Sequence, residues 1–150
     1  MQNGNTEKIW ELLNTVPDPE IPVISVVELG VIRNVEYVNK TYLISITPTY
    51  SGCPAVKTFQ DDIKICLSKN GIDNFDIKLV YFPAWTTDWM SDSTKKKLLK
   101  YGISPPSKKI ICPQCKSTST SLVSEFGSTA CKSFHKCNEC LEPFEHFKCI

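Results

Sequence analysis

The chain has 150 residues, of which 17 are basic and 16 acidic. This balance argues against nonspecific nucleic-acid binding, which requires a surplus of basic residues to neutralise phosphates. The length suffices for one ordinary domain with a buried core and a second, smaller domain. No apolar run reaches the roughly 18 residues that mark a membrane span, and the first residues are polar. We therefore expect a cytoplasmic protein without membrane segments.

Helical and strand patterns alternate from the beginning of the chain. Apolar residues at helical spacing predict an amphipathic helix over residues 6–16, and the prolines that follow end it. Residues 31–38 and 42–47 have the composition of strands. The pair Asn39-Lys40 between them predicts a short hairpin turn.

A second helix is predicted from Pro54 to about residue 70, because its apolar side chains recur on one face, and Gly71 ends it. Residues 76–82 predict a third strand, and residues 93–101 a further helix. This order of elements predicts an α+β fold in which a small mixed sheet is covered by helices.

The composition divides the chain into three expected parts. Residues 1–103 form the α+β domain, and residues 104–109 have the serine, proline and lysine composition of a linker. Residues 110–150 contain too few large apolar side chains to fold alone. We therefore expect a structural metal to stabilise this last part.

Four cysteines form the strongest motif in the sequence. Cys112 and Cys115 form one C-x-x-C pair, Cys137 and Cys140 form another, and 21 residues separate the two pairs. Each pair places two thiolates on a tight turn, and two such pairs supply four sulfur ligands in a tetrahedral arrangement. The predicted structure is a zinc-ribbon-like β domain with strands over 121–126 and 132–136.

The identity of the metal is left open by these ligands. Four thiolates suit structural zinc, and the same donors suit iron or an iron–sulfur cluster. The alternative is a pair of short-range disulfides, which a reducing compartment disfavours. Six of the eight cysteines lie beyond residue 111, whereas a disulfide scaffold would distribute its cysteines more evenly.

The remaining cysteines and histidines of this region allow more than one interpretation. Cys131 and Cys149 could exchange with the ligands, form a transient second site, or pack as small apolar residues. His135 and His146 are expected to be ordinary surface or packed residues, because four cysteines already complete a site. Cys66 lies on the apolar face of the second helix, where packing in the core is the expected role.

Cys53 is the principal candidate for a reactive thiol. It directly precedes Pro54, a residue favoured in the first turn of a helix. The N–H groups and dipole at a helix N-terminus stabilise a thiolate and lower its pKa. A nucleophile or transient metal ligand fits this position, and a helix-capping cysteine without chemistry is the alternative.

Two further features have both a functional and an ordinary interpretation. Asp18 and Glu20 lie in a constrained proline loop that could present carboxylates rigidly, although surface turn residues are commoner. Trp85 and Trp89 could line a groove for a partner, although buried aromatic residues are commoner. No serine–histidine–aspartate set and no glycine-rich phosphate loop occurs, so a directly catalytic enzyme is the least expected function.

Seven segments distributed along the chain form a recognisable set. They are Asp18-Pro19-Glu20-Ile21-Pro22, Val27-Glu28-Leu29-Gly30, Thr47-Pro48-Thr49-Tyr50-Ser51-Gly52-Cys53-Pro54, Pro83-Ala84-Trp85-Thr86-Thr87-Asp88-Trp89-Met90, Phe126-Gly127-Ser128-Thr129-Ala130-Cys131-Lys132, Glu142-Pro143-Phe144 and Phe147-Lys148-Cys149. Together they resemble the PaaD (PaaJ) family of phenylacetate degradation, which accompanies the multicomponent phenylacetyl-CoA epoxidase. The resemblance covers nearly the whole chain, and residues 1–103 are also similar to the wider SufT-like family of iron–sulfur assembly factors.

The resemblance implies an accessory role in maturing a metal centre of the epoxidase system, with the oxygenase and reductase components as clients and the iron–sulfur assembly machinery as a partner. It implies that Cys53 is reactive, that the acidic loop with Asp18 and Glu20 lies near it, and that Cys131 is a candidate transient ligand. A transient iron–sulfur cluster would be the cargo.

Two alternatives to a maturation factor stay open from the sequence. One is a docking or structural subunit of the epoxidase, and the other is an electron carrier with rubredoxin-like iron in the ribbon. We also expect the chain to self-associate through its sheet domain, as a homodimer.

Overall fold

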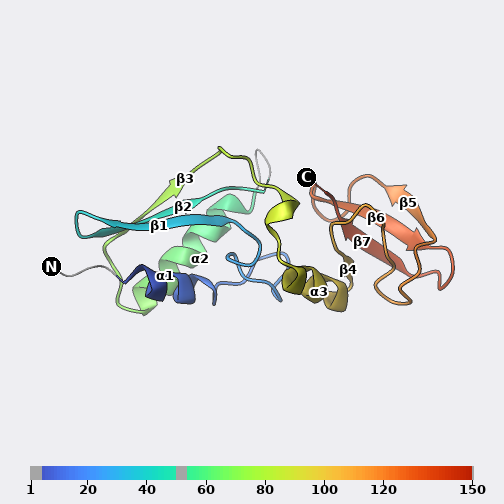
Figure 1. Ribbon diagram of the computed structural model, residues 1–150, viewed down its shortest axis with the longest axis horizontal. Helices are drawn as coiled ribbons and strands as arrows, with labels where there is room; N and C mark the ends of the chain where they lie inside the picture. Colours follow the sequence, from blue (N-terminus) through green and yellow to red (C-terminus); the bar gives the residue numbers. More distant parts are fainter. Residues whose placement is uncertain (1–4, 50–53, 150) are drawn as a thin grey trace. The chain divides into compact units, whose positions relative to one another are not determined.

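The computed structural model describes residues 5–49 and 54–149. The chain forms two compact units, Met1–Trp85 and Thr86–Ile150. Among the described residues, the first unit contains a three-stranded sheet with two helices, and the second contains a four-stranded sheet with one α-helix and a short 3-10 helix (Figure 1). The predicted α+β class with a C-terminal ribbon is confirmed.

The first sheet has the order β1 (Ile32–Val38), β2 (Thr41–Ile46), β3 (Phe75–Leu79). β1 and β2 are antiparallel, whereas β2 and β3 are parallel. Asn39 and Lys40 join the first two strands with positive φ angles of 51° and 64°. A two-residue turn of this kind matches the right-handed twist of the strands, so the predicted hairpin is confirmed.

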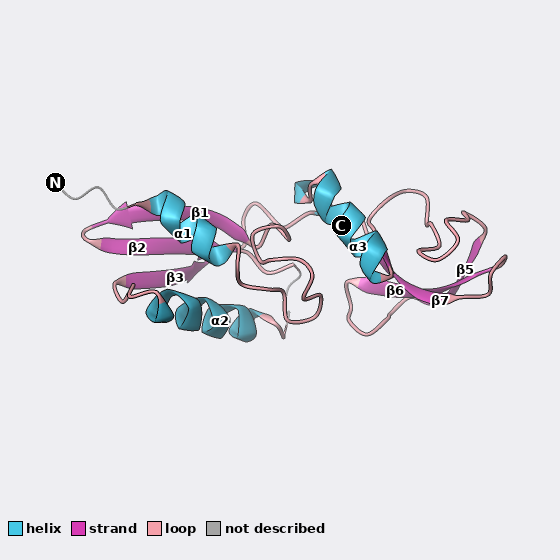
Figure 2. Ribbon diagram, turned by 90° about the horizontal axis from the view of Figure 1, so that it is seen from below, coloured by secondary structure: helices cyan, strands magenta, loops and turns pink. Residues whose placement is uncertain are grey.

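Helices α1 (Thr6–Leu13) and α2 (Val56–Lys69) lie on one face of this sheet (Figures 1 and 2). The side chain of Asn5 caps α1 by accepting a hydrogen bond from the N–H of Lys8 at 3.2 Å. The apolar faces of the two helices and the inner face of the sheet form an aliphatic core. Its fully buried members include Ile9, Leu13, Val26, Val31, Ile44, Ile63 and Leu67.

Two predicted elements of this unit are shorter than their apolar patterns. The first helix ends at Leu13 rather than at residue 16, and Thr15 donates its hydroxyl hydrogen to the carbonyl of Leu12 at 2.6 Å. The third strand ends at Leu79 rather than at residue 82, shortly before Pro83. Turns and prolines therefore end both elements before their apolar residues do.

The second unit begins with η1 (Thr87–Trp89) and α3 (Asp92–Tyr101). The hydroxyl of Ser91 caps α3 by accepting from the N–H of Thr94 at 3.2 Å. Gly102 ends the helix with φ 103°, a left-handed conformation that glycine adopts without strain.

The second sheet has the order β4 (Ile103–Ser104), β7 (Pro143–Phe147), β6 (Lys132–Cys137), β5 (Thr120–Ser124). β4 and β7 are parallel, and the other neighbouring pairs are antiparallel. β5 and β6 correspond to the two strands predicted for the ribbon. Since the compact units divide after Trp85, α3 belongs to the same unit as the ribbon.

The expected division into residues 1–103, 104–109 and 110–150 concerns parts that fold independently, and it stays a prediction. None of the helices in the described part of the chain has the length and apolar composition needed to cross a membrane.

Candidate metal centre and cysteine sites

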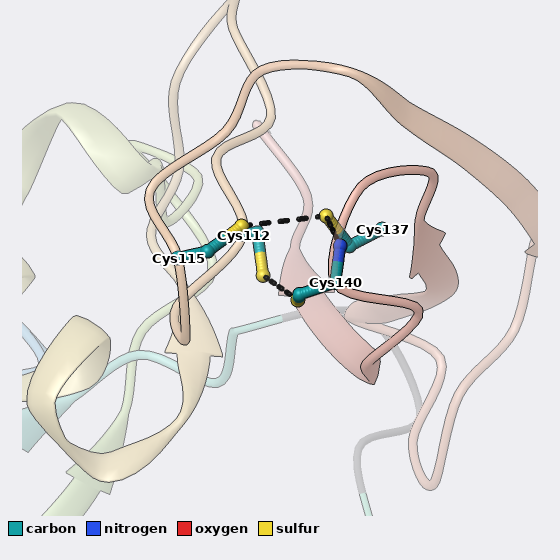
Figure 3. Close-up of side chains that lie close together, drawn as sticks. All are labelled: Cys112, Cys115, Cys137 and Cys140. Atoms are coloured by element: carbon teal, nitrogen blue, oxygen red, sulfur yellow. Dashed lines mark hydrogen bonds between the residues drawn. The ribbon is translucent and has the colours of Figure 1, made fainter.

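The four cysteines of the two C-x-x-C pairs converge in the second unit. Their sulfur atoms all lie within 4.8 Å of one another, and Figure 3 shows the side chains pointing together from two loops. The sulfurs of Cys112 and Cys140 are 3.6 Å apart, and those of Cys115 and Cys137 are 3.5 Å apart. These distances far exceed a disulfide bond of about 2.05 Å, so the four cysteines are free thiols.

The arrangement fits a tetrahedral metal ion. Zinc binds cysteine sulfur at about 2.3 Å, and four ligands at that distance in a tetrahedron lie about 3.8 Å from one another. Two of the sulfur–sulfur separations, 3.6 and 3.5 Å, lie close to this value, and none exceeds 4.8 Å. Because each sulfur ligand comes from a tight turn, the site needs little rearrangement to hold a metal.

The two turns have the same backbone geometry. In the first, the N–H of Cys112 donates to the carbonyl of Ser117 at 2.8 Å, and Lys116 has φ 66°. In the second, the N–H of Cys137 donates to the carbonyl of Glu142 at 2.9 Å, and Leu141 also has φ 66°. The repetition identifies two equivalent knuckles, each of which supplies two ligands.

Backbone N–H groups stabilise the thiolate form of Cys137. The N–H groups of Cys140 and Glu139 donate to the sulfur of Cys137 and lower its pKa to about 7. The pKa of Cys140 is lowered by a backbone bond from Glu142, but desolvation and the neighbouring thiols raise it to about 12. A bound divalent cation would lower the pKa of Cys140, because cysteines bind metals as thiolates.

The metal centre is covered on its inner side by apolar groups. Cys112 and Cys137 are fully buried and pack with Phe144 and the partly buried Ile110, whereas Cys115 and Cys140 are exposed. This cluster lies directly against the metal site and contains few apolar side chains. That a metal stabilises the ribbon stays a prediction.

His135 and His146 are both buried, as packed residues, and their rings are 5.6 Å apart. The hydroxyl of Ser133 lies 2.7 Å from Nε2 of His135. Desolvation, followed by the charge of His135, lowers the pKa of His146 to about 4. Since the four cysteines are the candidate metal group among the described residues, neither histidine is needed as a ligand.

Cys131 and Cys149 have different surroundings. Cys131 is buried just before β6, with its sulfur 3.0 Å from the hydroxyl of Thr129. The loop that precedes it is fixed by Glu145, whose carboxylate accepts from the hydroxyl of Ser128 at 2.9 Å. Cys149 is exposed. The structure thus gives Cys131 a defined environment, and its role as a transient ligand stays a prediction.

The proline loop turns one of its two carboxylates inward. Asp18 is buried and accepts hydrogen bonds from the N–H groups of Ile21 at 2.7 Å and Glu20 at 3.2 Å. The side chain of Glu20 is exposed. Cys53 lies outside the described residues. The proximity of these carboxylates to Cys53 therefore stays a prediction, and Asp18 has a clear structural role.

Ser25 and Glu28 form a local contact that was not predicted from the sequence. Ser25 and Glu28 bond reciprocally, since each side chain accepts from the other's N–H, at 3.2 and 3.0 Å. The spacing Ser-x-x-Glu is a recognisable capping signal.

Trp85 is buried and donates from Nε1 to the carbonyl of Leu29 at 2.9 Å, whereas Trp89 is half-buried. Cys66 is also half-buried, and its thiol donates to the carbonyl of Leu12 at 3.4 Å.

Two family models match the chain. Residues 100–148 match the PaaD zinc beta ribbon domain, and residues 6–69 match the iron-sulfur cluster assembly protein family. The first match contains all four cysteines of the metal centre. The second contains α1, β1, β2 and α2, and it also contains Asp18, Glu20 and Cys53.

Similar proteins share these two parts to different extents. A candidate 1,2-phenylacetyl-CoA epoxidase subunit from Escherichia coli (strain K12) is 45% identical, over 95% of this chain and 92% of its own length. An Fe-S protein maturation auxiliary factor from Porphyromonas gingivalis (strain ATCC BAA-308 / W83) is 35% identical, over 61% of this chain and 89% of its own length. The crystal structure of a DUF59 domain from Bacillus anthracis aligns with a TM-score of 0.57 at 30% identity, covering 61% of this chain and 89% of that one.

Proposed function

This chain belongs to the PaaD family of phenylacetyl-CoA epoxidase subunits, and on this premise we propose that it matures a metal centre of the epoxidase system. The family resemblance stated from the sequence is confirmed by the matches along the chain. The carrying observation is the combination of an iron–sulfur assembly domain and a metal ribbon in one chain with an epoxidase subunit as a relative. An assembly domain is expected to handle iron or a cluster as cargo rather than to transform an organic substrate.

In this proposal the four-cysteine centre is resident and structural, and zinc is its metal. Cys112, Cys115, Cys137 and Cys140 would hold the ion, which supplies stability by joining the two knuckles. Two of these cysteines are fully buried, and backbone N–H groups donate to the sulfur of Cys137, an arrangement suited to retaining a metal. A bound ion of this kind does not readily leave, so the transferred cargo requires other ligands.

Cys53 is the proposed ligand for the cargo, with Cys131, Asp18 and Glu20 as further candidates. α2 begins at Val56 with Ala55 as its cap, two residues later than the start at Pro54 predicted from the sequence, and its first turn contains no acidic residue. We propose that the N–H groups and dipole of this helix stabilise a thiolate at Cys53, which precedes the cap by two residues in the sequence. Soft thiolates bind iron or an iron–sulfur cluster, and few ligands allow its release to a client.

The oxygenase and reductase components are the proposed clients, with the iron–sulfur assembly machinery as the source of cargo, in the cytoplasm. The test is to produce each component with the wild-type chain or with Cys53→Ser and to measure its iron and acid-labile sulfide. We expect the folded variant to leave its client depleted of the metal centre. Clients that are fully loaded by Cys53→Ser would contradict the proposal, and Cys66→Ser is the matched control.

A docking subunit is the second candidate, and the name of the Escherichia coli relative favours it. It predicts stable co-purification with the oxygenase and indifference to Cys53→Ser. The proposed homodimer is tested separately, by the mass of the purified chain in solution. An electron carrier would require iron rather than zinc in the ribbon, and it would be coloured and reversibly reducible.

A further inference from the structure

The charges of the chain are divided unequally between its two units. From Thr86 onward there are ten lysines and six acidic residues, whereas the part up to Trp85 has seven basic and ten acidic residues. The second unit is therefore positive by four charges and the first is negative by three. The nearly neutral total conceals this difference.

The basic residues of the second unit concentrate in one stretch. Residues 93–124 contain seven lysines and no acidic residue, although Asp92, the first residue of α3, directly precedes them. Four of the lysines belong to α3, two precede the first knuckle, and one lies in that knuckle. They are Lys95, Lys96, Lys97, Lys100, Lys108, Lys109 and Lys116.

Helix α3 presents two of its four lysines, Lys96 and Lys100, on the side opposite to its packed face. Thr94 and Leu98 are buried, and α3 contacts β4. Lys96 and Lys100 are exposed and lie one turn apart, so their side chains are neighbours. Like charges at this spacing destabilise a helix. The repulsion is relieved when an acidic surface approaches.

The residue type indicates which kind of anion is bound. The chain contains sixteen lysines and a single arginine, Arg33, which lies in the first unit. Arginine is preferred where phosphates or bases are gripped by paired hydrogen bonds, whereas lysine acts as a mobile point charge. Lysines without arginines, on a chain whose other unit is acidic, favour an acidic protein surface over nucleic acid.

We propose that α3 and residues 105–110, with the exposed lysines Lys96, Lys100, Lys108 and Lys109, form a docking surface for an acidic face of the client protein. This basic surface rests on the proposed maturation function, since it names the partner of that function. Charge complementarity accelerates association and permits rapid release, which suits a factor that serves its client briefly.

The test measures association of the full-length protein with the purified oxygenase and reductase components of the source organism's epoxidase. The variant Lys96→Gln/Lys100→Gln/Lys108→Gln/Lys109→Gln removes four charges, and glutamine keeps the helix propensity of lysine. The control, Lys8→Gln/Lys57→Gln/Lys64→Gln/Lys69→Gln, removes four exposed charges from the first unit. Association rates are measured from low to physiological salt.

We expect the first variant to associate with one component about tenfold more slowly at low salt, with a weaker salt dependence, while the control associates like wild type. An equal loss in both variants, no loss in either, or no association of the wild-type chain with any component would overturn the proposal. Tighter binding to a duplex DNA probe than to either component would overturn it as well.

This result is independent of the maturation test. If Cys53→Ser loads its client fully while the lysine variant associates slowly, the docking surface stands and the maturation function falls. If Cys53→Ser fails to load the client and the lysine variant associates normally, the basic surface is wrong and the maturation function stands.

Discussion

The two units of this protein are stabilised in different ways. The first has an aliphatic core between two helices and a sheet, with Ile44, Ile63 and Leu67 completely buried. The second buries fewer aliphatic side chains, among them Leu98 and Ile103, and around its four cysteines Cys112 and Cys137 pack with Phe144. We therefore expect apolar burial to stabilise the first unit, and a metal held by the four cysteines to stabilise the ribbon. Substitutions in the core of the first unit should therefore change its stability without changing the metal content, and substitutions of the metal ligands should affect only the second unit.

The largest expected effect is the loss of a metal ligand. Cys137→Ser should reduce the metal content to near zero and open residues 110–149, because the remaining apolar cluster is too small to hold the ribbon. Metal analysis and limited proteolysis measure this, and the first unit should stay protected. The control is Cys149→Ser, which changes an exposed cysteine outside the metal site. Retention of the metal by Cys137→Ser would contradict the four-cysteine site.

A cavity in the aliphatic core should destabilise the first unit and leave the metal content of the ribbon unchanged. Ile63→Ala removes a completely buried side chain of α2 and should destabilise the first unit by about 2–5 kcal/mol. Ile65→Ala, on the exposed side of the same helix, should change stability by less than about 0.5 kcal/mol. Urea unfolding gives both values. If Ile63→Ala also caused the ribbon to lose its metal, the two units would not be independent.

Acidification should weaken the second unit through His146. Its pKa is about 4 in the fold against an ordinary value of 6.5, so only the unfolded chain takes up the proton between these values. Stability is unaffected above pH 6.5 and falls as the pH drops to about 4, by at most about 3 kcal/mol.

Unfolding followed over this pH range should show a shallower dependence in His146→Asn than in wild type. Metal loss at low pH is common to both proteins and is monitored in parallel. Identical pH profiles would show that His146 contributes nothing to the acid sensitivity.

The smallest expected effect concerns the proline loop of the first unit. Asp18→Ala leaves two N–H groups without their acceptor and should cost about 1–2 kcal/mol. Asp18→Asn keeps an oxygen acceptor and should cost less. If both variants fold like wild type but fail in client loading, Asp18 acts on the cargo rather than on the loop. Thermal unfolding and client loading together distinguish the two roles.

The sequence predicts best those features that are local. A C-x-x-C pair forms its knuckle from consecutive residues, so the four ligands were identified from spacing alone. The hairpin at Asn39-Lys40 and the helix that ends at Gly102 follow from equally local signals. The aliphatic face of α2 was visible as a repeat of apolar residues.

Features that depend on contacts between segments far apart in the sequence are harder to predict from it. The two-residue strand β4 exists because Ile103 and Ser104 pair with β7, far along the chain. The burial of Asp18 depends on a loop that is closed by a hydrogen bond, in which the N–H of Asp18 donates to the carbonyl of Ile24 at 2.8 Å. The buried histidine pair requires β6 and β7 to lie side by side. The role of Cys53 stays a prediction from the sequence and the family.

The most direct test of the central claim is the metal and acid-labile sulfide content of the protein purified without oxygen. The account predicts about one zinc per chain, retained in Cys53→Ser and lost in Cys137→Ser. It also predicts iron and sulfide that bind on reconstitution to the wild type and not to Cys53→Ser. Zinc alone under every condition, or iron that binds stably in the ribbon and is indifferent to Cys53, would contradict a maturation factor with separate resident and cargo sites.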